Sequence, residues 1–418
     1  MKNILHSAIL TTIIFALLFV VNSLPINSDF LDPLQQAFKD FELTDIVYSQ
    51  LLDEAPKRID TNIVLVNIGA LSRREIAVVI DRVMSVKPKI ASLDAMFLRE
   101  TDADETMELV RCINRYDNFV LAEQLLTGID QEISVLSGLS HDSLMPKEYG
   151  FVNFPSAVGS FRTVRSVTPF EHIDGKEHVA FAIKIAERIS REDVNYLKSR
   201  QASVETINYQ KLNSFVRVDF PQVLDTNISI DFIAGKIVLF GYLGERLNDI
   251  NSYEDRYFTP VNKRYAGKSF PDMFGVEIHA NILSMVLHRD YVNSMSFGVN
   301  IFLSWVFCFA VLYMFTVIDD KFPNYYDLIS KTLQILTIMF LLFMVIISFD
   351  YFRYRFDSAL AALAIALAAD GYQIYASALS ARNYSKNSKR PIVLNKGIDT
   401  SISLTKVQSS RKGRKKKR

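Results

Sequence analysis

The sequence predicts an α/β extracytoplasmic domain with a mixed, largely parallel sheet, and an α-helical transmembrane bundle of one N-terminal and three C-terminal spans. Two patterns predict this fold class. In the segment 58–292, β-branched apolar runs alternate with amphipathic stretches, as in parallel sheets with helical crossovers. Outside it, four apolar runs are long enough to cross a membrane. A chain with 49% hydrophobic and 22% charged residues fits this mixture and is not of the disordered or collagen-like class.

The first apolar run covers 4–24 and is interrupted only by small polar residues and by His6. It is long enough to act as an uncleaved anchor, with Lys2 at its cytoplasmic end. The alternative is a cleaved signal peptide, although the run exceeds the usual apolar core of one. Both interpretations place the following residues across the membrane. Residues 25–57 form a linker, within which 30–52 has apolar positions at helical spacing.

Three further spans are predicted within 296–379. The runs 296–318 and 332–349 contain no charged residue, and the run 358–379 contains one acid, Asp370. An acid inside a membrane is costly and frequently functional. Asp370 is therefore expected either to make a polar contact between helices or to lie near the cytoplasmic interface.

Basic residues predict the orientation. The tail 380–418 contains 13 Lys or Arg and one acid, so both termini are expected in the cytoplasm of a bacterial cell, at its inner membrane. The outside segment 25–295 has 39 acidic and 29 basic residues. The net charge of +1 is therefore the sum of an acidic outer segment and a basic tail. The last basic cluster is expected to contact anionic lipid headgroups or an acidic partner, or to be a solvated topology signal, with no nucleic acid expected. It comprises Arg411, Lys412, Arg414, Lys415, Lys416, Lys417 and Arg418.

The outside domain begins with strands and helices in alternation. Residues 62–69 are of buried-strand type, and 71–86 follow as an amphipathic helix. The pattern continues with a strand at 89–94, a helix at 101–115 and a strand at 118–122. This order predicts a parallel sheet with right-handed crossovers.

The middle of the domain is antiparallel in character. We expect one strand pair at 150–155 and 163–169, a covering helix at 178–189, and a second strand pair at 204–208 and 215–220. A strand at 235–241 then ends in a glycine turn, and a helix at 273–288 leads almost directly into the second membrane span.

Ligands of parallel sheets bind beyond the carboxyl ends of the strands. That rule predicts a mouth formed by Asn67, Asp94, Phe97, Arg99 and Gly241, with Arg73 and Arg74 as an anion-attracting rim. The plainer interpretation is that Asp94 caps a helix and the arginines are solvated. Asp255 and Arg256 lie on a loop after the 235–241 strand, where they either bind a ligand or another protomer or clamp the loop.

No motif predicts catalysis or a cofactor. The two cysteines, Cys112 and Cys308, fall outside the membrane and within a span, so they cannot pair. Glu277 and His279 stand two apart, which points them to different faces of a helix and argues against a metal site. Nucleophile-elbow, phosphate-loop and dinucleotide motifs are missing. We therefore expect no cofactor, no metal and no enzymatic activity.

Several motifs in this order resemble the second type of CHASE domain, CHASE-2, a family of extracytoplasmic sensory modules of bacterial receptors. The strongest are GKIVLFG at 235–241, DRYFTP at 255–260 and FGVEIHANILSMVL at 274–287. Weaker matches are IVLVNI at 63–68, KPKIASLDAMF at 87–97, GFVNF at 150–154 and INY at 207–209. The family also has one span before its outer domain and three after it. The resemblance implies an α/β sensory domain at 58–292.

The chain departs from the family pattern in two respects. The family usually carries an acid where Asn67 stands, and the Trp-rich turn before the first helix is reduced to residues 70–74. The tail is too short for a kinase, cyclase or phosphatase, so the resemblance implies a stand-alone sensor without an output domain. We expect it to detect an extracytoplasmic signal and act through a partner membrane or cytoplasmic protein. The partners considered include a second copy of the chain. The alternative is a non-signalling scaffold subunit of an envelope complex.

Overall fold

The chain is described by a computed structural model. The residues that it describes are 2–23, 45, 47–51, 59–97, 103–127, 133–141, 143–155, 163–247, 249, 251–262, 270–356 and 358–388. Much of the predicted 30–52 helix, Arg99 and the terminal basic cluster lie outside these residues.

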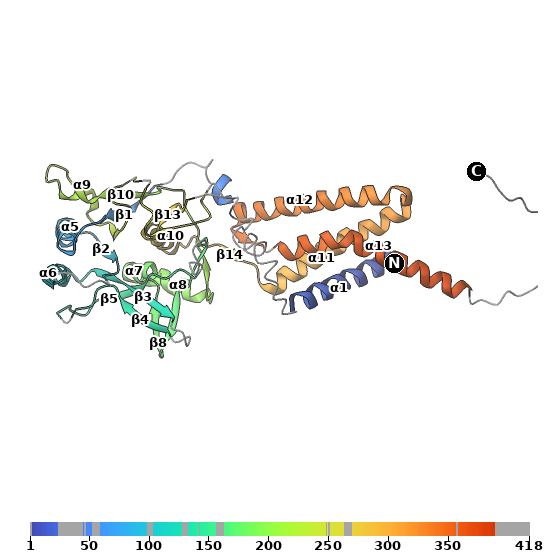
Figure 1. The fold of residues 1–418 in the computed structure, drawn as a ribbon, viewed down its shortest axis with the longest axis horizontal. Coiled ribbons are helices and arrows are strands. Elements are labelled where there is room, and N and C mark those ends of the chain that lie inside the picture. The colour runs from blue at the N-terminus through green and yellow to red at the C-terminus, as the bar shows by residue number, and fades with distance from the viewer. Residues whose placement is uncertain are drawn as a thin grey trace, which may run out of the picture. The chain divides into compact units, whose positions relative to one another are not determined.

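A seven-stranded sheet forms the centre of the α/β domain (Figure 1). Its order is β10-β1-β11-β2-β3-β4, and β5 also pairs with β3. All of its pairs are parallel except β3 with β4, so the mixed, largely parallel sheet is confirmed. The strands are β1 (Asp60–Asn67), β2 (Ile90–Asp94), β3 (Phe119–Thr127), β4 (Ile133–Ser137), β5 (Glu148–Phe151), β10 (Phe215–Asp219) and β11 (Ile237–Gly241).

Helices cover both faces of the sheet because alternate strand residues point to opposite sides. Val64, Val66 and Leu93 are buried on one face, which carries α5, α6, α9 and the short 3-10 turn η2. Ile63 and Leu65 are buried on the other face, against α7 and α10. The helices are α5 (Arg73–Ser85), α6 (Ala103–Asn114), α7 (Phe181–Ile189), α8 (Arg191–Ser199), α9 (Phe220–Leu224), η2 (Asp231–Ile233) and α10 (Gly275–His288).

The strand pairs predicted for the middle of the domain are wrong. The segment at 150–155 contributes to β5, which joins the main sheet parallel to β3. The segments at 163–169 and 204–208 pair with each other, as β6 (Ser166–Val167) and β9 (Glu205–Thr206). β10 lies at the sheet edge beside β1, not beside β9. Short apolar runs indicate a strand but carry no signal for its partner, which long-range packing decides.

The helix predicted at 178–189 begins later than expected. His178 belongs to a hairpin of β7 (Phe170–Ile173) and β8 (Lys176–Val179), and α7 starts at Phe181. The hairpin turn is Asp174-Gly175, both at positive φ, which explains why the chain reverses there. Another small sheet pairs β12 (Arg256–Tyr257) with β13 (Met273–Phe274), just before α10.

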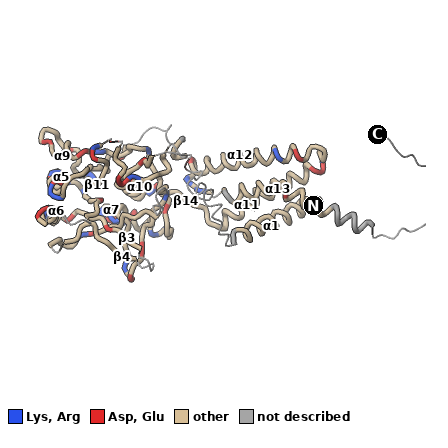
Figure 2. Tube along the Cα trace, in the orientation of Figure 1, with Lys and Arg blue, Asp and Glu red and all other residues tan. Residues whose placement is uncertain are grey.

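Four helices among the described residues are long and apolar enough to cross a membrane, one N-terminal and three C-terminal, as predicted. Asn3 at the start of the first helix donates to Asp320 at the end of the second, so these two helices are antiparallel. Charged residues concentrate in the α/β domain and near the helix ends (Figure 2). The helices are α1 (Lys2–Ser23), α11 (Phe297–Lys321), α12 (Tyr326–Phe352) and α13 (Ala359–Ser388).

Gly241 allows α10 to lie directly against the sheet. A Cβ atom at this position would be 2.6 Å from the Cβ of Val276. We expect Gly241→Ala to lower the free energy of unfolding by about 1–3 kcal/mol, because α10 has to move away from β11. Thermal unfolding of the full chain in detergent measures this. Gly298→Ala is the matched control, since nothing lies within 4 Å of its added Cβ; equal effects of the two variants would contradict the close-packing argument.

Candidate functional site

The carboxyl ends of three adjacent strands bring together the centre of the predicted mouth. Asn67 pairs in register with Gly241, and Gly241 pairs with Asp94. The rule that placed a site at this edge therefore located these three positions correctly relative to one another.

The hydrogen-bonding groups of the Asn67 side chain are all engaged within the fold. Its side chain is fully buried, and its amide nitrogen donates to Asp219 Oδ1 at 2.8 Å and to the Gly244 carbonyl at 3.0 Å. Its amide oxygen accepts from the backbone N–H groups of Gly69 and Leu243. Four hydrogen bonds satisfy a primary amide completely. Asn67 therefore ties the turns after β1 and β11 to β10.

The two arginines of the predicted rim join α5 to α6. The Arg73 guanidinium donates to Thr106 and to the Phe97 carbonyl, and it lies 5.2 Å from the centroid of the Phe97 ring. Arg74 forms an ion pair with Glu108 at 2.7 Å, and both of these side chains are largely solvated. The contacts of Arg74 fit the plainer interpretation better than a role as an anion rim.

Asp255 and Arg256 lie where the loop before β12 meets the start of α10. Asp255 is an exposed residue, yet its carboxylate faces α10: a Cβ on Gly275 would lie 2.8 Å from its Oδ2. The Gly275 N–H donates to the Asp255 carbonyl at 3.0 Å. Arg256 donates to the Asp249 carbonyl and lies over the Phe274 ring. Both residues therefore clamp this loop to the helix.

Asp94 and His279 form the core of a buried polar cluster beside that clamp. His279 Nε2 is 3.9 Å from Asp94 Oδ2, and the two side chains are 4% and 12% exposed. Burial lowers the pKa of His279 to about 3, which keeps the ring neutral. Burial and the neighbouring Asp255 charge raise the pKa of Asp94 well above its ordinary value. Burial also raises the pKa of Asp255.

The same cluster shows no metal site. Among the described residues, no group of three or more His, Cys, Asp or Glu is placed to hold a metal ion. Glu277 faces Arg217 at 3.4 Å, on a different side of α10 from the Asp94 contact of His279.

Asp370 lies on α13 with an exposed side chain.

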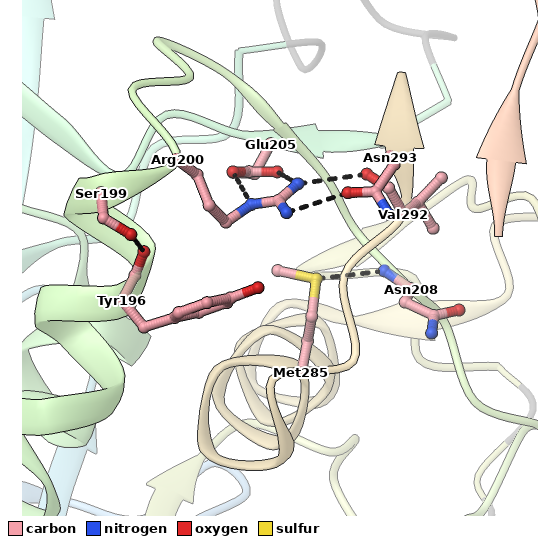
Figure 3. A network of polar contacts seen from close by, with 8 residues as sticks. All are labelled: Tyr196, Ser199, Arg200, Glu205, Asn208, Met285, Val292 and Asn293. Atoms are coloured by element: carbon pink, nitrogen blue, oxygen red, sulfur yellow. Dashed lines mark hydrogen bonds and ion pairs between the residues drawn. The ribbon is translucent and has the colours of Figure 1, made fainter. Parts of the chain in front are cut away.

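A second polar network holds the segment that connects α10 to α11 (Figure 3). Arg200, which follows α8, forms two hydrogen bonds with Glu205 at 2.7 and 3.1 Å. The same guanidinium donates to Asn293 Oδ1 at 3.0 Å and to the Val292 carbonyl at 3.5 Å. Glu205 is only 3% exposed, so this ion pair is largely desolvated. We call Arg200, Glu205, Val292 and Asn293 the Arg200 clamp.

The end of α10 is fixed to α8 as well. Arg289, the left-handed C-cap residue of α10, forms ion pairs with Glu192 and Asp193 at 2.6 and 2.7 Å. A pocket of about 240 Å³ opens beside the Arg200 clamp. It is lined by Arg200, Ala202, Val204, Glu205, Thr206, Val292, Asn293 and Ser294.

Two contacts reach the membrane helix α12, one from this segment and one from residues near the start of the chain. Asn293 and Ser294 form β14, which pairs in parallel with β15 (Tyr354–Arg355) at the end of α12. Tyr48, in the short π-helix η1 (Val47–Leu51), packs edge-on against Phe349 of α12 with ring centroids 5.3 Å apart. The hydroxyl of Tyr48 donates to the Ile207 carbonyl of the α/β domain.

The family model of the CHASE2 domain matches residues 11–318, well over half of the chain. The protein belongs to the CHASE2 family. No curated protein and no solved structure matches it significantly. The match covers the α/β domain and extends into α1 on one side and α11 on the other. CHASE2 is a family of extracytoplasmic sensory domains. The match confirms the family that the sequence motifs resemble.

The residues of the Arg200 clamp were not predicted as part of a site. In this CHASE2 chain, Arg200 and Glu205 stand in a polar stretch whose spacing resembles no motif. One signal was available, because Glu205 lies between Val204 and Thr206-Ile207 in a short β-type run, and a buried acid requires a partner. The sequence does not indicate that the partner also holds residues 292–293.

Proposed function

We propose that this CHASE2 protein detects an extracytoplasmic signal and passes it through its membrane helices to a partner protein. The observation that carries the proposal is the continuous path α10–β14–α11. α10 is packed against the main sheet, and only the clamped residues 289–296 separate it from a membrane helix. A shift of α10 would therefore be transmitted to α11 with little loss, since rigid elements carry coupling.

The proposal includes a topology and a mode of output. α1 and α11 are antiparallel, and β14–β15 pairing puts the start of α11 beside the end of α12. This arrangement, together with the basic tail, supports an inner-membrane protein with both termini in the cytoplasm. We assign no enzymatic activity to the chain, and we place output in a protein that binds the helices or the tail.

A scaffold function is the second candidate. It is favoured by Asn67, Arg73 and Arg74, whose polar atoms bond within the fold instead of lining an open mouth. A scaffold would hold its partners constantly, whereas a sensor would change its partners with the signal.

A short Gly/Ser insertion between Ser294 and Met295 distinguishes the two functions. Tagged full-length protein is crosslinked in cells grown in media of different acidity, divalent cation content and osmolarity, and its bound proteins are quantified. We expect the wild type to change its bound partner between media at least about threefold, which is ~0.65 kcal/mol of coupling. The insertion should abolish that change, because it breaks the path to α11.

The same insertion between Asp174 and Gly175, in the β7–β8 turn, is the control and should respond like the wild type. The sensor proposal is contradicted if the insertion after Ser294 responds as the wild type does. A constant, stoichiometric complex in every medium and every variant would instead establish the scaffold.

A further inference from the structure

The pocket beside the Arg200 clamp offers little to a cation. Glu205 is the only acid in its walls, and both carboxylate oxygens of Glu205 accept hydrogen bonds from Arg200 (Figure 3). The Asn293 Oδ1 atom accepts another hydrogen bond from the same guanidinium. The negative charge in the pocket walls is therefore already compensated by Arg200.

Hydrogen-bond donors in the same walls are left without acceptors. Arg200 has five N–H groups, of which four are engaged, so one hydrogen on its Nη1 atom remains. The Asn293 Nδ2 group and the hydroxyls of Thr206 and Ser294 form no hydrogen bond with the residues that the structure describes. Guanidinium and amide nitrogens can only donate, and hydroxyls can donate. The pocket therefore fits a chemical group with several acceptor oxygens.

The pocket lies where the membrane helices begin. Ser294 in its wall pairs with Arg355, just after α12, and α11 starts at Phe297. Tyr351 and Tyr354 are exposed at the end of α12, and tyrosines concentrate at the interfaces between membrane and water. Phospholipid phosphates occupy the same layer. The pocket is therefore at the depth of these phosphates.

The size of the pocket and the helix beside it suit a lipid held by its head group. The volume of about 240 Å³ is below the range of roughly 300–1,000 Å³ of pockets that enclose drug-sized ligands. At the start of α11, Phe297, Val299 and Phe302 have exposed apolar side chains on which acyl chains can pack.

We propose that this pocket binds the phosphate group of an outer-leaflet phospholipid. The phosphate oxygens accept hydrogen bonds from Arg200, Thr206 and Ser294, and bonds to a charged acceptor are the stronger kind. Thr206 lies in β9 and Ser294 in β14, so one bound phosphate bridges the outer domain and the segment that enters α11. This lipid site goes beyond the sensory function proposed above and does not depend on it.

Native mass spectrometry of the full-length protein in detergent, titrated with dioctanoyl phosphatidylglycerol, tests the site. We expect Thr206→Val/Ser294→Ala to weaken the first lipid-binding step at least about tenfold, because two donors to a charged group are lost. Ala202→Phe keeps those donors but fills the pocket, so it should weaken binding to a similar extent. Thermal unfolding without added lipid verifies that each variant is folded.

The matched control is Thr127→Val/Ser203→Ala. Both residues are exposed and neither lines the pocket, so this variant should bind phosphatidylglycerol as the wild type does. The proposal is overturned if Thr206→Val/Ser294→Ala and Ala202→Phe both retain wild-type affinity.

Two further probes identify the part of the lipid that is recognised. Dioctanoylglycerol has the same chains without phosphate and should bind wild type and pocket variants equally weakly. Free glycerol phosphate should bind the wild type at least about tenfold more weakly than the lipid, because it has no chains to pack on α11. Equal affinity for dioctanoylglycerol and phosphatidylglycerol would overturn phosphate recognition. Equal affinity for glycerol phosphate and phosphatidylglycerol would overturn the lipid and assign the pocket to a soluble phosphate compound.

Discussion

Replacing Arg200 with glutamine is expected to cost about 3–5 kcal/mol of unfolding free energy, because it leaves a buried carboxylate without its partner. Glu205 is 3% exposed and receives two hydrogen bonds from Arg200. The same substitution releases Asn293 and the Val292 carbonyl, so the junction with α11 also loosens. Denaturant unfolding of the full chain in detergent measures the first effect.

Two further variants separate charge burial from the junction. Arg74→Gln removes an ion pair with Glu108 that is solvated on both sides, so its cost should stay below about 1 kcal/mol. The double variant Arg200→Met/Glu205→Leu should recover most of the stability, because no buried charge is left. It should not recover signal-dependent partner binding, since Asn293 stays released. An Arg200→Gln cost as small as that of Arg74→Gln would show that the clamp is not desolvated.

Asn67→Asp is expected to lower the unfolding free energy by about 3 kcal/mol, the cost of unmade buried hydrogen bonds and of a new like-charge contact. The substituted oxygen would face Asp219 Oδ1 and the Gly244 carbonyl, both of which now accept hydrogen bonds from Asn67. Chemical denaturation at neutral pH measures the loss. Asn67→Leu separates the lost hydrogen bonds from the repulsion.

Exchanging the pair tests the repulsion directly. Asn67→Asp combined with Asp219→Asn again puts an amide donor opposite a carboxylate, so it should recover about half of the lost free energy. Recovery is incomplete because Gly244 remains without its donor and because Asp219 also accepts from Leu247. If the combined variant is less stable than either single one, the hydrogen bond between the two side chains is not what Asn67 contributes.

Most of the strands and helices of this domain were predictable from their patterns. The run 62–69 and the helical period at 71–86 gave β1 and α5 to within two residues at each end. Ser72 and Glu75 form a capping box that fixes the start of α5. These signals are local, because burial of one face imposes the period regardless of what covers it.

Strand pairing in the middle of the domain was not predictable in the same way. β9 is two residues long, and β10 has a burial pattern that several partners would satisfy. β10 joins the sheet edge because its carboxyl end brings Asp219 to Asn67 across the strand pair. This hydrogen bond joins two residues that are 152 positions apart, so no local sequence pattern predicts it.

The site could be predicted in position but not in chemistry. The strand-end rule brought Asn67, Gly241 and Asp94 together, because register follows from parallel pairing. It could not show that Asn67 is saturated by backbone groups, which depends on the paths of two loops. Arg200 is recognised only from the structure, since its partners come from β9 and from the segment after α10.

Coupling between the outer domain and α11 is the central claim, and Trp305 measures it most directly. It is the only tryptophan of the chain, lies on α11 and stacks on Phe309 with ring centroids 5.3 Å apart. In lipid nanodiscs, we expect its emission to shift when the acidity, divalent cation content or osmolarity of the bathing medium is changed, and we expect no shift after Gly/Ser insertion between Ser294 and Met295. The insertion between Asp174 and Gly175 should leave the shift intact. An equal shift in the variant interrupted after Ser294 would contradict transmission through α10, β14 and α11.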